Sequence, residues 1–173
     1  MRERLAAAVV AVLCATAAVA CTGSDGGTAV AGGDVPFVAV DASSASPTDR
    51  AIGAAQDRLR ADPDDLKAKL DLAQAFLQKA RETADPTLYG KAELLLDQVA
   101  EGAEPNPAVL VAQGTLALAQ HRFADARTLG TRALDLAPGS EAALGVVVDA
   151  SNELGRYDEA LEATQEMVDA RPN

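Results

Sequence analysis

Side chains that could act as nucleophiles, bases or metal ligands are sparse in this chain of 173 residues. The single histidine, His121, lies four residues before Asp125, a spacing that places the two side chains one helical turn apart. A histidine–carboxylate pair becomes catalytic beside a serine or cysteine nucleophile in a suitable setting, and the sequence shows no such setting. We therefore interpret His121 as a solvated turn residue and expect a protein that is not an enzyme.

Metal sites are not expected either. The chain has no second histidine to complete a zinc site, and both cysteines, Cys14 and Cys21, lie near its start. Asp62, Asp64 and Asp65 are close in sequence but lack the glycine and the distal glutamate of a calcium-binding loop. Helix capping explains them better, so the sequence predicts no metal and no other cofactor.

The elements that carry these side chains follow a repeat of 34 residues. The equivalent positions are Tyr89, Phe123 and Tyr157; Ala92, Ala126 and Ala160; and Val99, Ala133 and Met167. An aromatic residue three positions before a small one, at this period, is typical of antiparallel helix pairs stacked as a solenoid. The alanines let the helices of a pair approach closely, and we expect the aromatic rings to fill the turns.

Residues 62–173 resemble the tetratricopeptide repeat family. The residues that carry the resemblance are Leu144, the segment 155–160 and Pro172 in the last unit, and Leu110, Gly114, the segment 123–126 and Pro138 one period earlier. The first unit begins at Asp62-Pro63. The resemblance implies an all-α, right-handed solenoid with one leader helix, from Pro47 to about Ala61, and three helix pairs, which makes seven helices.

The chain departs from the family pattern at three places. The turn of the first unit is seven residues longer, over residues 81–87, and we expect these residues to extend the loop. Gly130 stands where the family usually places a bulky residue, and Ser151 stands where it usually places tyrosine. These two substitutions predict loose packing in the last two units.

Helix starts are predicted from capping residues that precede proline. An Asp, Asn or Ser side chain accepts a leading backbone N–H, and proline suits the first helical position because its nitrogen has no hydrogen to satisfy. This pair of residues occurs at Ser46-Pro47, Asp62-Pro63, Asp85-Pro86 and Asn106-Pro107. We expect one helix to start at each.

The first 20 residues are typical of an export signal. Arginines flank Glu3, the stretch 5–20 is uncharged, and Ala18-Val19-Ala20 precedes Cys21. This alanine-rich stretch has sixteen residues, fewer than the roughly 20 apolar residues that are needed to span a bilayer. The junction resembles a bacterial lipobox, which implies that Cys21 is acylated and becomes the new N-terminus. Ordinary cleavage after Ala20, giving a secreted soluble protein, is the alternative.

A small, polar tract follows this junction. Residues 21–46, the lipid-attachment cysteine and a stretch rich in Gly, Ser, Thr and Ala, are interpreted as a flexible tether to a helical domain at 47–173. Within the tether, Val35 to Val40 is expected to be an extended linker. Cys14 leaves with the signal, so the exported chain has no disulfide. We expect attachment to a bacterial cell membrane or envelope.

Charge restricts the partners. The formal net charge is −11, and loss of residues 1–20 removes a net charge of +1, which leaves −12. An acidic surface repels phosphates, and no local cluster of lysine and arginine offsets this. Nucleic acid is therefore disfavoured, and a neutral or cationic protein or peptide is the expected partner.

The resemblance also implies a concave groove lined by the first helix of each pair. The residues that it assigns to this groove are Lys67, Leu70, Asp71, Gln74 and Leu77; Val111, Thr115 and Leu118; and Gly145, Val146, Asp149 and Asn152. Lys67 alone does not form the clamp with which chaperone-binding members hold a terminal carboxylate. The alternative for Val111 and Leu118 is that they only pack within the solenoid.

Two functions remain open. The first is an exported, lipid-anchored adaptor that binds another protein in the concave groove. The second is a non-catalytic accessory subunit, or a fragment, of a larger envelope enzyme or assembly factor. The second is motivated by the ending at Arg171-Pro172-Asn173 without a capping helix, which leaves Leu161, Thr164 and Val168 available to a partner or to a second copy.

Overall fold

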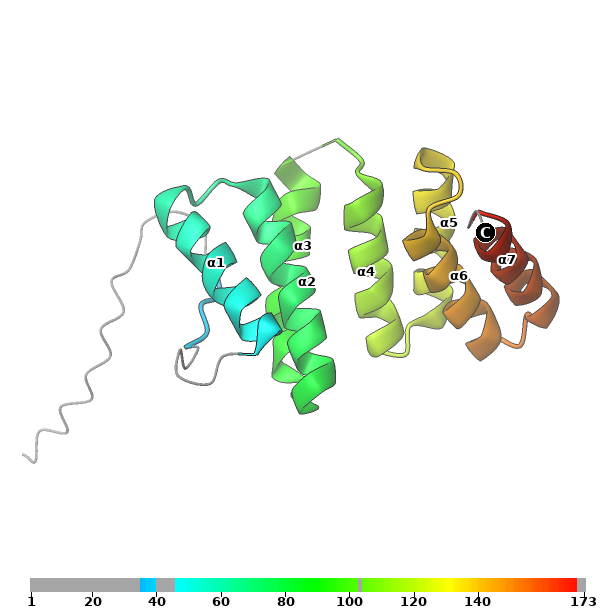
Figure 1. Cartoon of the computed structure of the whole chain (residues 1–173), viewed down its shortest axis with the longest axis horizontal. Helices are drawn as coiled ribbons and strands as arrows, with labels where there is room; N and C mark the ends of the chain where they lie inside the picture. The colour runs from blue at the N-terminus through cyan, green and yellow to red at the C-terminus, as the bar shows by residue number, and fades with distance from the viewer. Residues whose placement is uncertain (1–34, 40–45, 103, 171–173) are drawn as a thin grey trace, which may run out of the picture. The chain divides into compact units, whose positions relative to one another are not determined.

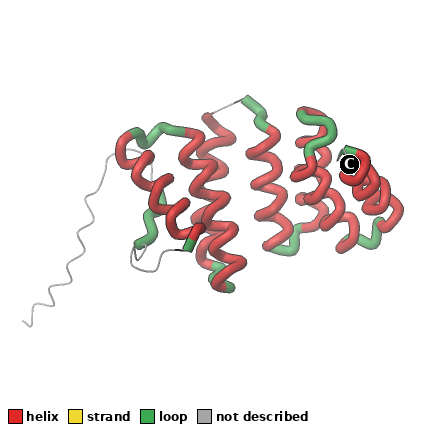
Figure 2. Tube along the Cα trace, viewed as in Figure 1, coloured by secondary structure: helices red, strands yellow, loops and turns green. Residues whose placement is uncertain are grey.

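The computed structural model describes residues 35–39, 46–102 and 104–170. These residues form seven α-helices and no strand (Figures 1 and 2). The helices are α1 (Pro47–Ala61), α2 (Leu66–Thr83), α3 (Thr87–Gly102), α4 (Pro107–Ala119), α5 (Phe123–Leu136), α6 (Glu141–Glu153) and α7 (Tyr157–Asp169). The predicted leader helix and three helix pairs are confirmed. The predicted export signal and Cys21 lie outside the described residues.

The helices stack as antiparallel pairs. The pairs are α2–α3, α4–α5 and α6–α7, and α1 packs on α2. The first helices of successive pairs touch, α2 against α4 and α4 against α6, whereas α3, α5 and α7 make no such contacts with one another. The first helices therefore form the inner layer of this domain. No helix within the described ranges is both long and apolar enough to cross a membrane.

The expectation that residues 81–87 extend the loop of the first unit is wrong. Helices α2 and α3 have 18 and 16 residues, whereas α4 and α5 have 13 and 14. Five extra residues in α2 and two in α3 account for all seven inserted residues, and the turn over 84–86 is as short as that over 120–122. Each residue added to an existing helix gains a backbone hydrogen bond, which favours lengthening the helices.

Two of the turns place a residue in the left-handed region at the same repeat position. Gly155 has φ 72°, and His121, 34 residues earlier, has φ 57°. A side chain in this conformation costs roughly 1–2 kcal/mol, although histidine tolerates it better than most residues. His121 is exposed in this turn, and its ring meets the ring of Phe123 edge-on, with centroids 5.6 Å apart.

The largest core cluster lies at the N-terminal end of the stack. It is centred on Phe76 and is filled by large aliphatic side chains from α1, α2 and α3, among them Ile52, Leu72 and Leu95. Three smaller clusters, rich in alanine and valine, join α4 to α7. Because these buried side chains are smaller, each contact in the second half removes less apolar area from water.

The repeated small residues occupy the positions predicted for them. Ala92 and Ala126 are fully buried and Ala160 nearly so. The aromatic positions differ from one another: Tyr89 and Phe123 are half-buried, but Tyr157 is 69% exposed. The expectation that Tyr157 fills its turn is therefore wrong, because no described helix covers the outer side of α7.

Loose packing around Gly130 is also a wrong expectation. A Cβ on Gly130 would lie 2.9 Å from Cγ2 of Val147, and one on Gly114 would lie 2.8 Å from Cγ1 of Val146. Both distances are shorter than normal carbon contacts, so the two glycines permit close approach of α4 and α5 to α6. Ser151, the other departure, is fully buried in α6.

The predicted capping residue with proline in the first turn is confirmed at Ser46-Pro47 and Asn106-Pro107, whereas at Asp85-Pro86 the helix begins one residue later than predicted, at Thr87. Ser46 forms a capping box with Asp49, Asn106 accepts from the N–H of Ala108, and Asp85 accepts from the N–H of Thr87 at 2.9 Å. The prediction at Asp62 is wrong. Asp62 is the C-cap of α1, and the connection of four residues, 62–65, ends with Asp65, which caps α2 by accepting from the N–H of Ala68.

Part of the predicted tether touches this domain. Residues 35–39 have no helix or strand, and Val35 and Val38 pack against the core cluster around Phe76. The Arg60 guanidinium lies 5.4 Å from the centre of the Phe37 ring, a cation–π contact. This short stretch is therefore docked on the helices.

The glycine contacts predict opposite effects for two Gly→Ala substitutions. Gly130→Ala is expected to lower the free energy of unfolding by about 1 kcal/mol or more, because Val147 is stiff and the helices must separate. Gly90→Ala, where nothing lies within 4 Å of the new Cβ, is expected to raise it by about 0.5–1 kcal/mol through helix propensity. Urea unfolding followed by circular dichroism measures both, and equal effects would contradict close packing at Gly130.

Candidate protein-binding groove

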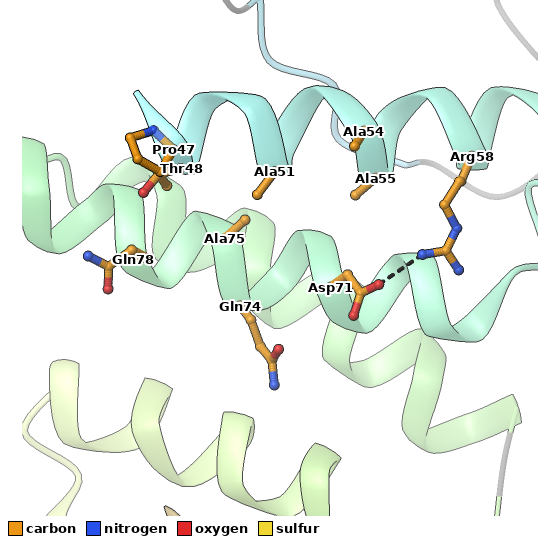
Figure 3. A pocket seen from close by; sticks show the side chains of 10 residues that line it. All are labelled: Pro47, Thr48, Ala51, Ala54, Ala55, Arg58, Asp71, Gln74, Ala75 and Gln78. Carbon is orange, nitrogen blue, oxygen red and sulfur yellow. Dashed lines mark hydrogen bonds and ion pairs between the residues drawn. The ribbon is translucent and has the colours of Figure 1, made fainter. Parts of the chain in front are cut away.

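A groove of about 550 Å³ runs between α1 and α2 (Figure 3). It is lined by Pro47, Thr48, Ala51, Ala54, Ala55 and Arg58 of α1, and by Asp71, Gln74, Ala75 and Gln78 of α2. We call this surface the α1/α2 groove. A second cavity, of about 360 Å³, lies among α3, α4 and α5 and contains none of the predicted groove residues.

The local sequence explains the shape of the α1/α2 groove. Ala51, Ala54 and Ala55 recur at spacings of three and four, so their methyl groups share one stripe of α1. Gln74 and Gln78, four residues apart on α2, add amide groups to the lining, and Figure 3 shows Ala75 of α2 pointing toward α1 while the Gln74 side chain points away from it. The groove therefore has an apolar alanine lining beside amide groups.

One end of the groove is held by an ion-pair network. Arg58 donates to Asp65 at 2.7 Å and to Asp71 at 2.8 Å, and Lys67 also pairs with Asp71 at 2.8 Å. The N–H of Ala68 and the Arg58 guanidinium keep the pKa of Asp65 below its usual range. Because two cations, Arg58 and Lys67, face the two carboxylates of Asp65 and Asp71, this end of the groove has a balanced charge.

The other end is held by two more contacts between α1 and α2. Lys79 pairs with Asp49 at 2.7 Å, and the hydroxyl of Thr48 donates to Glu82 at 2.6 Å. The hydrogen bond from Lys79, with those from Ser46, lowers the pKa of Asp49, and the bond from Thr48 lowers that of Glu82. These carboxylates are therefore bound in their ionised form.

The predicted groove residues differ in accessibility. Exposed are Lys67, Gln74, Asp149 and Asn152; half-buried are Leu70, Asp71, Val111, Thr115, Leu118 and Gly145; buried are Leu77 and Val146. Leu77 and Val146 are only 3% and 4% exposed, so both serve the core and offer no surface to a partner. Val111 and Leu118 pack against the smaller clusters of α4 to α6, as the alternative interpretation expected.

The structure brings only Asp71 and Gln74 of the predicted residues into the α1/α2 groove. The other wall comes from α1, which the resemblance did not assign to the binding surface. The regular spacing of small residues from Ala51 to Ala55 was the available signal. Only the packing of α1 on α2 shows that Ala51 and Ala54 of this stripe remain open to the groove while Ala55 is buried in the core.

No catalytic or metal centre is seen in the described part of the chain. It contains no group of three His, Cys, Asp or Glu side chains arranged to hold a metal ion. His121 and Asp125 both lie exposed at the α4–α5 turn, where Asp125 is 3.6 Å from Arg122. The α1/α2 groove, the larger of the two cavities described above, has an alanine and amide lining that suits binding.

The C-terminal third of the chain matches a known family. Residues 117–173 match the family model described as tetratricopeptide repeat. No curated protein matches the sequence significantly.

Solved structures of MamA share the fold. A crystal structure of MamA is 17% identical, with a TM-score of 0.58, over 75% of this chain and 77% of that chain. The structure titled MamA MSR-1 C2 is 23% identical, with a TM-score of 0.54, over 71% of this chain and 67% of that chain. A MamA mutant is 24% identical, with a TM-score of 0.53, over 72% of this chain and 86% of that chain. At these identities the similarity concerns the fold alone.

The contacts at the ends of the groove predict acid sensitivity. Asp49 and Glu82 have folded-state pKa values below their ordinary 3.8 and 4.5, so their stabilising effect is complete above those values. Stability should fall as the pH drops below them, because the unfolded chain then takes up protons that the folded chain excludes. Denaturant midpoints measured at a series of pH values test this.

Asp49→Asn provides the specific test. This variant should have a lower denaturation midpoint than the wild type at pH 7, and the two midpoints should converge in acid. Asp57→Asn is the matched control, since Asp57 is exposed and, among the described residues, pairs with Arg60 on the same helix. A constant difference between Asp49→Asn and wild type at every pH would show that Asp49 acts without its charge.

Proposed function

We propose that this protein is an exported, lipid-anchored adaptor that binds another protein through the α1/α2 groove, on the basis of the tetratricopeptide repeat match over residues 117–173 and the solenoid fold. The family and the fold support protein binding in general, since repeat solenoids present extended surfaces to other proteins. The α1/α2 groove, with its alanine lining and adjacent amides, is the observation that carries the proposal.

The composition of the groove favours an extended peptide segment. Alanine side chains leave room for larger apolar side chains of a partner, whose burial would provide affinity. The amide of Gln74, which is exposed, can both donate to and accept from a peptide backbone. A neutral or cationic segment suits the net charge of −11.

Export and lipid attachment rest on the sequence of the first 46 residues. The uncharged stretch 5–20, the small residues before Cys21 and the polar tract after it support a lipoprotein signal followed by a tether. In this proposal, the lipid holds the chain at a bacterial membrane while the helical domain recruits its partner. Nothing in the proposal requires catalysis or a cofactor.

Partner capture should depend on the α1/α2 groove. Ala51→Glu places a longer, charged side chain on an exposed groove position and is expected to abolish capture with helicity unchanged. Ala124→Glu is the control, because Ala124 is equally an exposed helical alanine but lies on α5. Crosslinking in cells followed by mass spectrometry compares the proteins captured by each variant.

Retention of the same captured proteins by Ala51→Glu would show that the groove is not the binding site. Ala51 is preferred to Val111 or Leu118 for this test, because those two side chains are half-buried and pack against core residues. A charge at either position would confound loss of binding with loss of packing.

The anchor is tested separately through Cys21. Cys21→Ala should move the protein from the membrane fraction to the soluble fraction, because a thiol is required for acylation. Cell fractionation and the intact mass of the exported protein measure this. A soluble wild-type protein with a free N-terminus at Cys21 would instead support ordinary secretion.

A further inference from the structure

An apolar stripe runs along the outer side of α7. It consists of Tyr157, Leu161, Thr164 and Val168, spaced at four, three and four residues, which places them on one helix face. Tyr157 and Leu161 are each 69% exposed and Val168 is 60% exposed. We call this face the α7 stripe; it contains the three residues that the sequence predicted to be available to a partner.

The internal repeat shows what such a face holds elsewhere in the molecule. The residues 34 positions earlier are Phe123, Arg127, Gly130 and Leu134 of α5. In α5 this face is covered by α6, with Gly130 directly against Val147 and with Leu134 packed on the cluster that contains Leu144 and Val147. The α7 stripe is therefore the repeat of a face that receives a helix.

The surroundings of the α7 stripe are acidic. Asp158, Glu162, Glu166 and Asp169 are exposed along the adjoining side of α7, and α7 contains no lysine or arginine. None of the four forms an ion pair with another described residue, in contrast to Glu159, which binds Arg127 at 2.7 Å. A second copy of this chain would bring the same carboxylates to the contact and be repelled.

We infer that the α7 stripe binds an amphipathic helix of another protein, whose apolar face is flanked by lysine or arginine. The helix lies on α7 as α6 lies on α5, and its basic residues pair with the four carboxylates. In α5, Gly130 leaves room for Val147 of α6. In α7 the equivalent residue is Thr164, which has a side chain, so the bound helix has a small residue at the position that Val147 occupies in α6. The surface is separate from the α1/α2 groove, and this inference does not depend on the groove's function.

A synthetic peptide provides the probe. The peptide is an amphipathic helix with a stripe of alanine and leucine flanked by lysines. It also carries a terminal tryptophan, whose fluorescence reports on the peptide alone because this protein has no tryptophan. A second peptide with glutamates in place of the lysines is the matched control. Titration into the full chain should show tighter binding of the lysine peptide, with an affinity that falls as salt is added.

Variants of α7 locate the binding surface. Leu161→Asp should weaken binding of the lysine peptide about tenfold or more, because it places a charge at the centre of the apolar contact. Leu94→Asp is the control, since Leu94 is also exposed, at 41%, but lies on α3. Glu162→Gln with Glu166→Gln should weaken binding less and reduce its salt dependence.

Three results would overturn the inference. The first is equal binding of the lysine peptide by wild type and Leu161→Asp, or no binding by either. The second is equal binding of the two peptides by wild type. The third is concentration-dependent self-association in sedimentation that Leu161→Asp abolishes, which would assign the stripe to a second copy. Tyr157→Ser, a milder change at the end of the stripe, replaces Leu161→Asp if circular dichroism shows that the latter loses helicity.

Discussion

Close approach of neighbouring helices is the constraint on which the rest of this domain depends. Few large side chains are available, and Phe76 is the one aromatic residue among the fully buried large side chains of the described core. Cohesion must come from many short contacts, which fall off steeply with distance. Ala126, Gly114 and Gly130 are the positions at which a larger side chain would separate the helices of the second half. The repeat interval keeps such small residues in register from one pair to the next.

The same use of small residues creates the candidate binding surface. Where alanines face another helix they permit close packing, and where Ala51 and Ala54 line the space between α1 and α2 they leave a groove. Polar contacts then set the position of α1. Arg58 joins Asp71 at one end and Lys79 joins Asp49 at the other, so the width of the groove depends on partly exposed ion pairs. The width of such a binding site therefore depends on whether the carboxylates in its walls are ionised.

In a stack of repeats, a helix face is an internal contact where the next helix packs on it, and is available for docking where no helix does. Each unit touches only its neighbours, so one pattern of residues serves both purposes according to what lies beside it. The face of α5 around Gly130 is closed by α6, whereas the equivalent face of α7 around Thr164 is open among the described residues. The carboxylates beside the open face add a charge requirement that the closed face lacks. The α1/α2 groove and the α7 stripe thus differ in chemistry.

The sequence by itself determined the helices, their pairing and the small residues between them, because helical periodicity and the 34-residue interval are local properties of the chain. Tertiary structure decided what depends on distances between helices. The inserted residues 81–83 extend α2, Gly130 is tightly packed, and Tyr157 is uncovered. Of the predicted groove, Asp71 and Gln74 share a surface while Leu77 and Val146 are buried. A helical position fixes the direction of a side chain relative to its own axis, but whether that side chain is buried depends on how the neighbouring helix sits against it.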